Sequence, residues 1–180
     1  AKWFTLAANK EHKYALYSLG MLYLHGKGVE QDEETACQLF LRSHNKGNPY
    51  ASYELGKLYE SRKGTQKNQE KAENCYRVAF LRFLNLEKKS KDDTLWYRIG
   101  SMYLHGIGTE ADEKLAEKYL LKAEDYGNVH AAYQLAKLYI RQETEKLQRK
   151  PEEAPDYEKI RKAIKWLTEA AEKENPFADY

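Results

Sequence analysis

Histidine and cysteine are the side chains of this sequence best suited to metal binding or nucleophilic chemistry. They are few and scattered, at His12, His25, His44, His105, His130, Cys37 and Cys75. The sequence has no glycine-rich phosphate loop, no His-Glu-x-x-His zinc motif and no Gly-x-Ser-x-Gly nucleophile motif. The cysteines are too few for a disulfide framework, and we interpret them as small buried hydrophobic residues. We therefore predict no catalytic, cofactor or metal site, and a protein that is not an enzyme.

The composition suits a folded domain with a sizeable core. Of the 180 residues 42% are hydrophobic and 32% are charged, and 30 basic residues nearly balance 28 acidic ones. Opposite charges alternate along the chain, so no basic stripe predicts nucleic-acid binding. No apolar run approaches the roughly 18 residues of a membrane span. We expect no membrane partner and leave the compartment open, with the cytoplasm favoured.

One tyrosine-rich segment recurs four times. Tyr14-Ala15-Leu16-Tyr17-Ser18-Leu19-Gly20-Met21-Leu22-Tyr23 returns at Tyr50–Tyr59, at Leu95–Tyr103 and at Ala131–Tyr139, with shifts of 36, 44 and 36 residues. A second segment follows each copy, with alanine, an apolar pair and a small residue at offsets 3, 4 and 7, as in Ala36, Leu39, Phe40 and Ser43. These offsets define one face of a helix, so each repeat is predicted to be helix A, a turn, helix B and a turn.

The residues between the segments fit this interpretation. Glycine follows helix A at Gly26 and Gly106, where it allows a left-handed cap. Asp32, Asn68 and Asp112 stand where each helix B should begin and are predicted N-caps. A single helix pair cannot bury its apolar faces, so stability must come from stacking of neighbouring pairs. The sequence therefore predicts an all-α fold, a solenoid of antiparallel helix pairs.

The repeat spacing also gives domain boundaries. We expect one repeat domain over 1–180, with the end of a preceding repeat at 1–13, repeats at 14–49, 50–93, 94–129 and 130–176, and the start of another repeat at 177–180. Trp3–Ala8 resembles Trp166–Ala171, so the chain is expected to open inside a helix B of a longer array. The second repeat is predicted to have a lengthened helix B. The charged insertion 141–161 is predicted to be an exposed loop that leads to a helix start at Asp156.

The pattern Ala-x-Tyr-x-Leu-Gly-x-x-Tyr, then Gly-x-Gly, then Asp and Gly-Asn-x-x-Ala resembles the Sel1-like repeat family, which is related to tetratricopeptide repeats. The first and third copies carry nearly all of it, the second lacks the first loop glycine, and the fourth has Ala136 in place of glycine. The resemblance implies a right-handed superhelix whose concave groove is lined by A helices, and an adaptor that gathers other proteins. Some secreted bacterial members have a cysteine pair in each repeat, and this chain does not.

The face of helix A opposite Ala15, Leu19 and Tyr23 is the expected binding surface. Tyrosine offers a large rigid contact area with a hydrogen-bonding tip, and basic residues there would hold a carboxylate of a bound segment. Tyr17, Tyr53, Tyr97 and Tyr133 are expected to form a ladder, although packing between helices would also explain them. The predicted groove residues are Tyr14, Tyr17, Met21, His25, Tyr50, Tyr53, Lys57, Tyr97, Ser101, His105, His130, Tyr133, Lys137 and Arg141.

The expected partner is a peptide or helical segment of another protein. Two alternatives stay open. The first is based on similar arrays that follow the catalytic domains of bacterial plasmid-mobilisation relaxases. Under this alternative the chain is an accessory region that contacts DNA or accessory proteins. The second is end-to-end self-association of the array.

Overall fold

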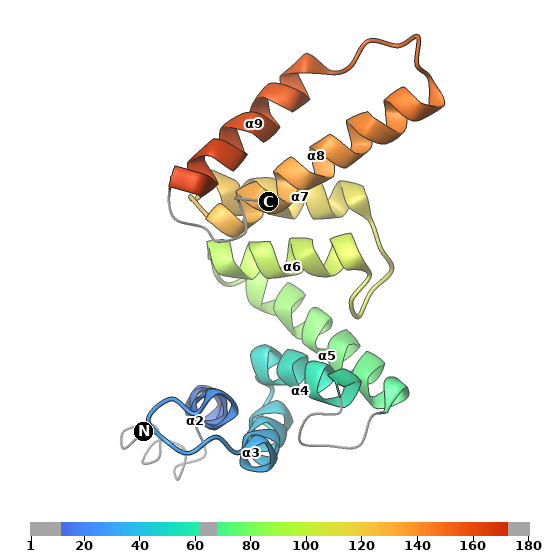
Figure 1. The fold of residues 1–180 in the computed structure, drawn as a ribbon. Coiled ribbons are helices and arrows are strands. Elements are labelled where there is room, and N and C mark those ends of the chain that lie inside the picture. The colour runs from blue at the N-terminus through green and yellow to red at the C-terminus, as the bar shows by residue number, and fades with distance from the viewer. Residues whose placement is uncertain (1–11, 62–67, 173–180) are drawn as a thin grey trace. The chain divides into compact units, whose positions relative to one another are not determined.

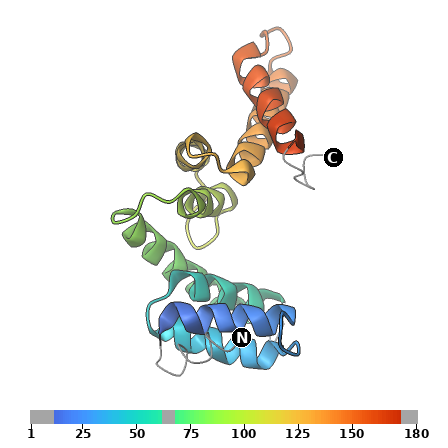
Figure 2. The ribbon, with the colours of Figure 1, turned by 90° about the vertical axis from the view of Figure 1, so that its left-hand side faces the viewer.

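The computed structural model describes residues 12–61 and 68–172, and within these ranges it contains eight helices and no strand. The helices are α2 (Lys13–His25), α3 (Glu33–Asn45), α4 (Pro49–Ser61), α5 (Gln69–Glu87), α6 (Asp93–His105), α7 (Glu113–Asp125), α8 (Val129–Arg149) and α9 (Tyr157–Glu172). Figures 1 and 2 show them as successive hairpins of helix A and helix B. The predicted all-α fold of paired helices is confirmed.

The chain divides into two compact units, each of which holds two helix pairs. Unit 1 is Ala1–Lys89 with Ile107–Glu110, and unit 2 is Ser90–Gly106 with Ala111–Tyr180. In unit 1, α2 pairs with α3, α4 pairs with α5, and α3 packs on α4. In unit 2, α6 pairs with α7, α8 pairs with α9, and α7 packs on α8. Within each unit the second helix of one pair thus packs on the first helix of the next, as stacking requires.

Predicted caps begin and end the helices. The carboxylate of Asp32 accepts from the backbone N–H groups of Glu34 and Thr35, each at 3.0 Å, and Asn68 and Asp112 cap α5 and α7 in the same way. The hydrogen bonds from the Thr35 hydroxyl and amide hold the pKa of Asp32 below its usual value. Gly26 ends α2 in the left-handed conformation, with φ of 65°, which costs glycine little.

Each core lies between paired helices. The core of unit 1 includes Phe40 and Leu55, and that of unit 2 includes Leu120 and Leu135, each at most 1% exposed. Full burial of such a side chain contributes about 1.5–3 kcal/mol. The glycine of the repeat permits this packing, because a Cβ built on Gly20 would lie 2.6 Å from the Phe40 ring.

Two predictions about the long repeats have different outcomes. The lengthened helix B is confirmed, since α5 runs for 19 residues where α3 and α7 have 13. The predicted loop over 141–161 is wrong for its first part, because α8 continues to Arg149 and only a short turn precedes α9. Glu145 and Arg149 form an i,i+4 ion pair at 3.6 Å along this extension. Both are residue types with a high helix propensity. Asp156 does cap α9, accepting from the N–H groups of Glu158 and Lys159.

The expected ends of the array, at 1–8 and 177–180, lie outside the described residues.

Candidate partner-binding surface

All the predicted groove residues lie on A helices or at their ends, and none of them is buried. Seven are half-buried: Tyr17, Met21, Tyr50, Tyr53, Tyr97, Ser101 and Tyr133. Seven are exposed: Tyr14, His25, Lys57, His105, His130, Lys137 and Arg141. A large ring that stays half-open to solvent on a rigid helix is suited to contact with another molecule.

The same aromatic contact joins successive A helices in both units. In unit 1 the rings of Tyr17 and Tyr50 have centroids 5.8 Å apart with planes inclined by 40°. In unit 2 the rings of Tyr97 and His130 have centroids 5.8 Å apart with planes inclined by 38°. The two contacts are equivalent, since Tyr17 and Tyr97 occupy one repeat position and Tyr50 and His130 occupy another. Each unit therefore carries an aromatic pair across its two A helices.

This contact differs in one respect from the expected ladder. The ring that meets Tyr17 belongs to Tyr50, one helical turn before Tyr53. Tyr53 itself contacts Tyr76 of its own helix B, at 5.4 Å between centroids, and Tyr17 likewise contacts Phe40 at 5.8 Å. Tyr17 and Tyr53 thus each pack against helix B of their own repeat. This is the packing role that the sequence analysis left open.

The extension of α5 supports the surface in unit 1, a role that the sequence analysis missed. Phe83 is fully buried and meets Tyr50 edge to face, with centroids 5.0 Å apart. On the same turn, Arg82 donates to the carbonyl of His44 at 2.9 Å and to the hydroxyl of Ser52 at 2.8 Å. The extra length of the second repeat was the available signal, but length alone does not identify what the added turn contacts.

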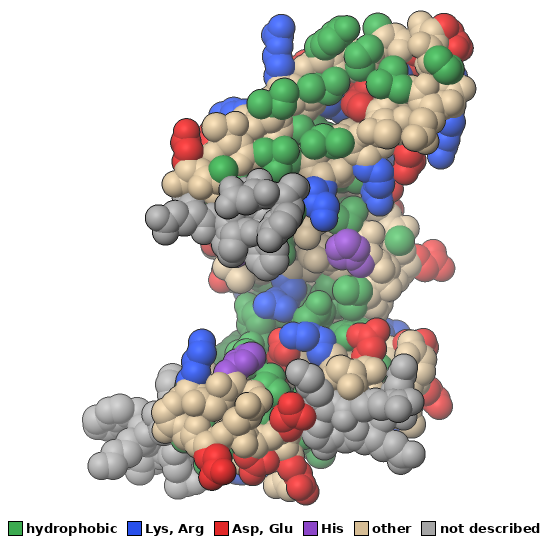
Figure 3. All heavy atoms as spheres, viewed as in Figure 1, with side chains coloured by type: hydrophobic (Ala, Val, Ile, Leu, Met, Phe, Trp, Pro, Cys, Tyr) green, Lys and Arg blue, Asp and Glu red, His purple; other side chains and the backbone are tan. Residues whose placement is uncertain are grey.

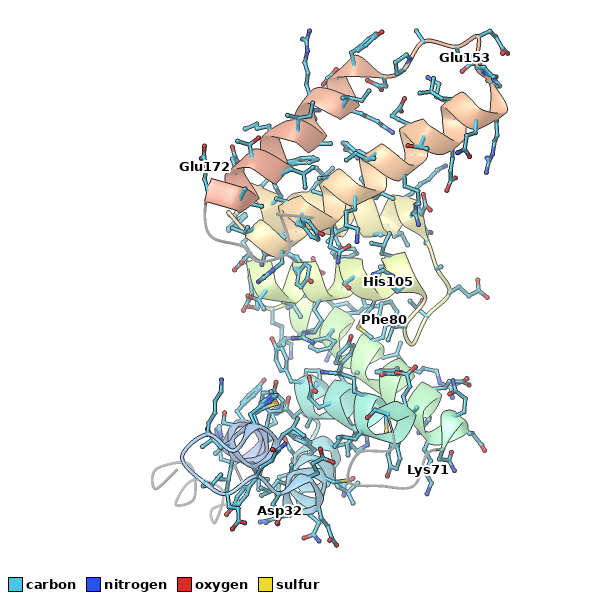
Figure 4. All side chains as sticks on the ribbon, in the orientation of Figure 1. Asp32, Lys71, Phe80, His105, Glu153 and Glu172 are labelled. Carbon is cyan, nitrogen blue, oxygen red and sulfur yellow. The ribbon has the colours of Figure 1, made fainter. Side chains whose placement is uncertain are left out.

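The cations of the surface already have neighbours. Lys57 pairs with the buried carboxylate of Glu54 at 2.9 Å. Arg141 donates to Glu113 of α7 at 2.6 Å, and Lys137 lies over the Tyr133 ring, 5.5 Å from its centroid. Of these three, Lys57 and Arg141 pair with carboxylates, whereas the contact of Lys137 within the described residues is with an aromatic ring. His25 and His105 are the last residues of α2 and α6, and Figure 4 labels His105 there.

Burial raises the pKa of several titratable side chains in the part of the chain that the structure describes. Burial, and then the charge of Glu34, raise the pKa of the Cys37 thiol, and burial raises the pKa of Cys75. A raised pKa leaves less of the reactive thiolate. Burial and hydrogen bonds to Glu60 and Glu117 raise the pKa of Tyr76 and Tyr139. Within the described ranges, no three His, Cys, Asp or Glu side chains gather as a metal site would need, and no helix is long and apolar enough to cross a membrane.

The helix pairs coincide with a known repeat. The Sel1 repeat model matches residues 13–48, 49–80, 97–128 and 129–175, which is most of the chain. The chain belongs to the Sel1 repeat family. Sel1 repeats are generally non-catalytic scaffolds for protein–protein interaction, and the four matched segments correspond to the four helix pairs. No curated protein matches the sequence.

Two solved structures are similar to this chain, and the first of them supports the fold. A Sel1 repeat protein from Oxalobacter formigenes is 26% identical with a TM-score of 0.61, and the match covers 98% of this chain and 64% of that one. A protective antigen of uropathogenic Escherichia coli strains, with an SLR fold, is 20% identical with a TM-score of 0.45 over 99% of this chain and 42% of that one. This Sel1 chain therefore spans about two thirds of the length of the first structure and less than half of the second.

Proposed function

We propose that the A-helix face of each unit binds a peptide or helical segment of a partner protein. The observation that carries the proposal is the aromatic pair that both units repeat, Tyr17 with Tyr50 and Tyr97 with His130, at the same centroid distance of 5.8 Å. A core contact would bury these rings, but none of them is buried. Half-open aromatic rings on rigid helices provide binding area at small entropic cost.

The charges around the rings describe the partner further. In unit 2 the cation of Lys137 stands over Tyr133, beside the exposed His130 and Arg141 on the same helix. In unit 1 the ammonium group of Lys57 already forms an ion pair with the carboxylate of Glu54. We therefore propose that a segment bound to either unit presents apolar side chains to the rings of that unit, and that a segment bound to unit 2 also presents a carboxylate near Lys137. Such a segment fits the aromatic and cationic groups without leaving a buried charge unpaired.

The alternative of an accessory region that contacts DNA stands second. Phosphate binding requires cations that are free to pair with the backbone of the nucleic acid. Lys57 and Arg141 instead form ion pairs with Glu54 and Glu113. A DNA-binding titration at low salt distinguishes the two functions, because the accessory role predicts salt-dependent binding and the peptide role predicts none.

The proposed function predicts that loss of the tyrosines weakens binding more than it weakens the fold. A displayed peptide library is selected on the intact chain, and the enriched peptide is titrated against a Tyr53→Ala, Tyr97→Ala double variant. We expect the affinity to fall at least about tenfold, or 1.4 kcal/mol, with a smaller loss of unfolding free energy, because each ring makes only part of its contacts within its own repeat.

The control is Tyr157→Ala, which removes an exposed tyrosine of α9 from outside the A-helix face. It should leave the affinity unchanged. If binding and thermal stability fall in proportion in the double variant, the tyrosines serve packing and the proposal fails. A peptide whose binding depends on Tyr157 instead would place the site on another surface.

A further inference from the structure

Four aromatic rings form a continuous row through unit 1, and each ring comes from a different helix. Tyr17 of α2 contacts Phe40 of α3, with ring centroids 5.8 Å apart. Tyr17 also contacts Tyr50 of α4 at 5.8 Å, and Tyr50 contacts Phe83 of α5 at 5.0 Å. The phenylalanines at the two ends are fully buried, and the tyrosines in the middle are half-buried. We call these four residues the ring row.

The buried ends of the ring row fix the orientation of its half-open middle. Aromatic rings attract each other when their centroids lie about 4.5–7 Å apart in tilted or edge-to-face arrangements. The planes of Tyr17 and Phe40 are inclined by 38°, and those of Tyr50 and Phe83 by 79°. A buried side chain in a close-packed interior is held by its neighbours. Each tyrosine therefore has a ring on both sides, and a change in its orientation would break one of these contacts.

The ring row depends on residues that the other repeats do not share. Phe83 lies four residues after Ala79, and the matching position in the first and third repeats is a turn glycine, Gly47 or Gly127. Phe83 can occupy this position because α5 continues past the point where α3 and α7 end. The two residues thus have an aromatic role that the repeat pattern does not require.

Unit 2 differs from unit 1 in this respect. Leu120 stands at the position of Phe40, so the pair of Tyr97 and His130 has an aliphatic residue where unit 1 has a ring. Residue 174, which matches Phe83, lies outside the described residues. The aromatic pair is therefore common to both units, whereas the described part of the chain shows buried rings on both sides of it in unit 1.

Fixed rings and free side chains differ in what binding requires of them. Figure 3 shows hydrophobic side chains gathered over α8 and α9 of unit 2, where Ile140 and Ile164 are 45% and 58% exposed. Side chains that project into solvent must be ordered when a partner binds, and this ordering reduces the affinity. The rings of Tyr17 and Tyr50 are ordered by contacts within the unit before any partner arrives.

We propose that Phe40 and Phe83 are positioning residues of the unit 1 face, which hold the Tyr17 and Tyr50 rings in the orientation that a partner segment meets. Both are buried, so they act on the partner through the tyrosines and do not touch it. The proposal rests on the proposed function, because it concerns the same face. It adds that the affinity of unit 1 depends on two core residues of α3 and α5.

The order of the two tyrosine rings tests the positioning role without any partner. NMR relaxation of ring-labelled tyrosine reports motion on the ps–ns timescale, and Tyr17→Phe and Tyr50→Phe assign the two signals. Phe83→Leu should lower the order of the Tyr50 ring, and Phe40→Leu should lower that of the Tyr17 ring. Circular dichroism checks that both variants fold. Phe40→Leu should fold, because unit 2 has Leu120 at the matching position.

The matched control is Leu39→Val on α3. Leu39 is buried in a separate cluster with Leu16 and Leu19, so this change lowers the stability of unit 1 without touching the ring row. It should leave the order of both rings unchanged. Wild-type ring order in a folded Phe83→Leu or Phe40→Leu variant overturns the proposal.

Affinity measurements test whether the fixed orientation matters for binding. A peptide that is enriched on the intact chain, and that loses binding in Tyr17→Ala, is titrated against the same variants at a temperature where each is folded. We expect Phe83→Leu and Phe40→Leu to bind about fivefold more weakly, because binding must then order a ring. Leu39→Val should bind as the wild type does.

The two measurements separate the proposal from the function on which it rests. Rings that lose order without a loss of affinity overturn the positioning role, although the peptide still binds to the face. If no enriched peptide depends on Tyr17, the proposed function fails for unit 1, and the positioning role fails with it whatever the order of the rings.

Discussion

In each unit one helix pair packs on the next at a junction, which is α3 on α4 in unit 1 and α7 on α8 in unit 2. The two junctions share one backbone turn. In unit 1, Gly47 has φ of 81° and its N–H donates to the carbonyl of His44 at 2.8 Å. In unit 2, Gly127 has φ of 83° and donates to Glu124 at 2.7 Å. An asparagine follows each glycine and caps the next helix. The turn is therefore constant, and the side chains around it are free to differ.

The buried side chains of the two junctions differ in polarity. Unit 1 places Ser43 and Ser52 where unit 2 has Ala123 and Ala132, and all four are at most 6% exposed. The Ser43 hydroxyl donates to the carbonyl of Lys13 at 2.6 Å, and Arg82 reaches Ser52 from α5. These hydrogen bonds link α3 to α2 and α5 to α4, and Arg82 also donates to His44 of α3, so all four described helices of unit 1 are joined at the junction.

Unit 2 retains the buried Asn128, whose amide donates to Asp93 at 2.8 Å, and carries hydrogen bonds of its α7–α8 junction at the rim. Its hydrogen bonds between α7 and α8 come from Tyr139, Arg141 and Gln142, towards partly exposed glutamates. A small hollow of about 30 Å³ lies beside Asn128, lined by Ala132 and Trp166 among others. Hydrogen bonds that are buried and mutually satisfied specify a geometry more strictly than exposed pairs do. The comparison teaches that one repeat family can hold the same turn with a polar interior, or with a more apolar interior and further hydrogen bonds at the rim.

Replacement of the two asparagines should give the largest effect. The Asn48 amide donates to Lys13 and Ser43 and accepts from the Tyr50 N–H, and the side chain is fully buried. We expect Asn48→Ala to destabilise unit 1 by about 2–3 kcal/mol, because several buried groups lose partners. Asn128→Ala should destabilise unit 2 by about 1–2 kcal/mol, through loss of the cap and of one hydrogen bond, to Asp93, where Asn48 makes two. Amide hydrogen exchange in α4 and in α8 measures each unit separately.

Equal losses in the two units, or a larger loss for Asn128→Ala, would contradict the stated difference between the junctions. Asn45→Ala is a suitable control, since Asn45 is an exposed residue at the end of α3. It should change the exchange rates of α4 very little.

Removal of the Arg82 guanidinium should have a smaller effect. Arg82→Met keeps an aliphatic chain of similar length and deletes the hydrogen bonds to His44 and Ser52, which makes the unit 1 junction more like that of unit 2. We expect a loss of about 1 kcal/mol in unit 1, the usual net contribution of such bonds, measured by urea denaturation. Arg77→Met on the exposed side of α5 is the matched control and should be nearly neutral. A neutral Arg82→Met would mean that the polar interior contributes no stability.

The sequence predicted the repeating parts of this molecule better than the parts that occur once. The helix pairs, and the caps at Asp32, Asn68 and Asp112, follow from local spacing and from hydrogen bonds between near neighbours, so they can be derived from the sequence. The predicted loop over 141–161 failed because charge and two prolines were taken as signs of irregular structure. Glu143 is in fact buried and accepts from the N–H of Asp156, which a charge count cannot reveal.

The candidate surface was predicted in the same uneven way. The face of helix A follows from helical periodicity, and its residues do lie partly open to solvent. Tyr17 contacts Tyr50, and Phe83 packs against Tyr50. In both contacts the two residues are 33 positions apart in the sequence. Such long-range contacts need the relative placement of helices, which no local pattern contains.

The smallest predicted effect concerns the protonation of His44 in the unit 1 junction. His44 lies half-buried in that junction, with Nδ1 3.0 Å from the Ser52 hydroxyl. Burial, and then the charge of Arg82, lower the pKa of His44 in the folded protein. The unfolded chain therefore binds more protons than the folded chain once the pH falls below about 6.5, the usual pKa of histidine. The stability that the neutral imidazole contributes is present above that pH and is lost as the pH falls through it towards the lower folded value.

Thermal melts between about pH 7.5 and pH 5.5 should show this dependence. We expect the melting temperature of the wild-type chain to fall more steeply over this range than that of His44→Gln, which cannot take up the proton. Unit 2 has Glu124 at the matching position, so this dependence is expected of the unit 1 junction. If His44→Gln and the wild type show the same slope, protonation of His44 does not couple to folding, and the polar junction tolerates a second positive charge beside Arg82.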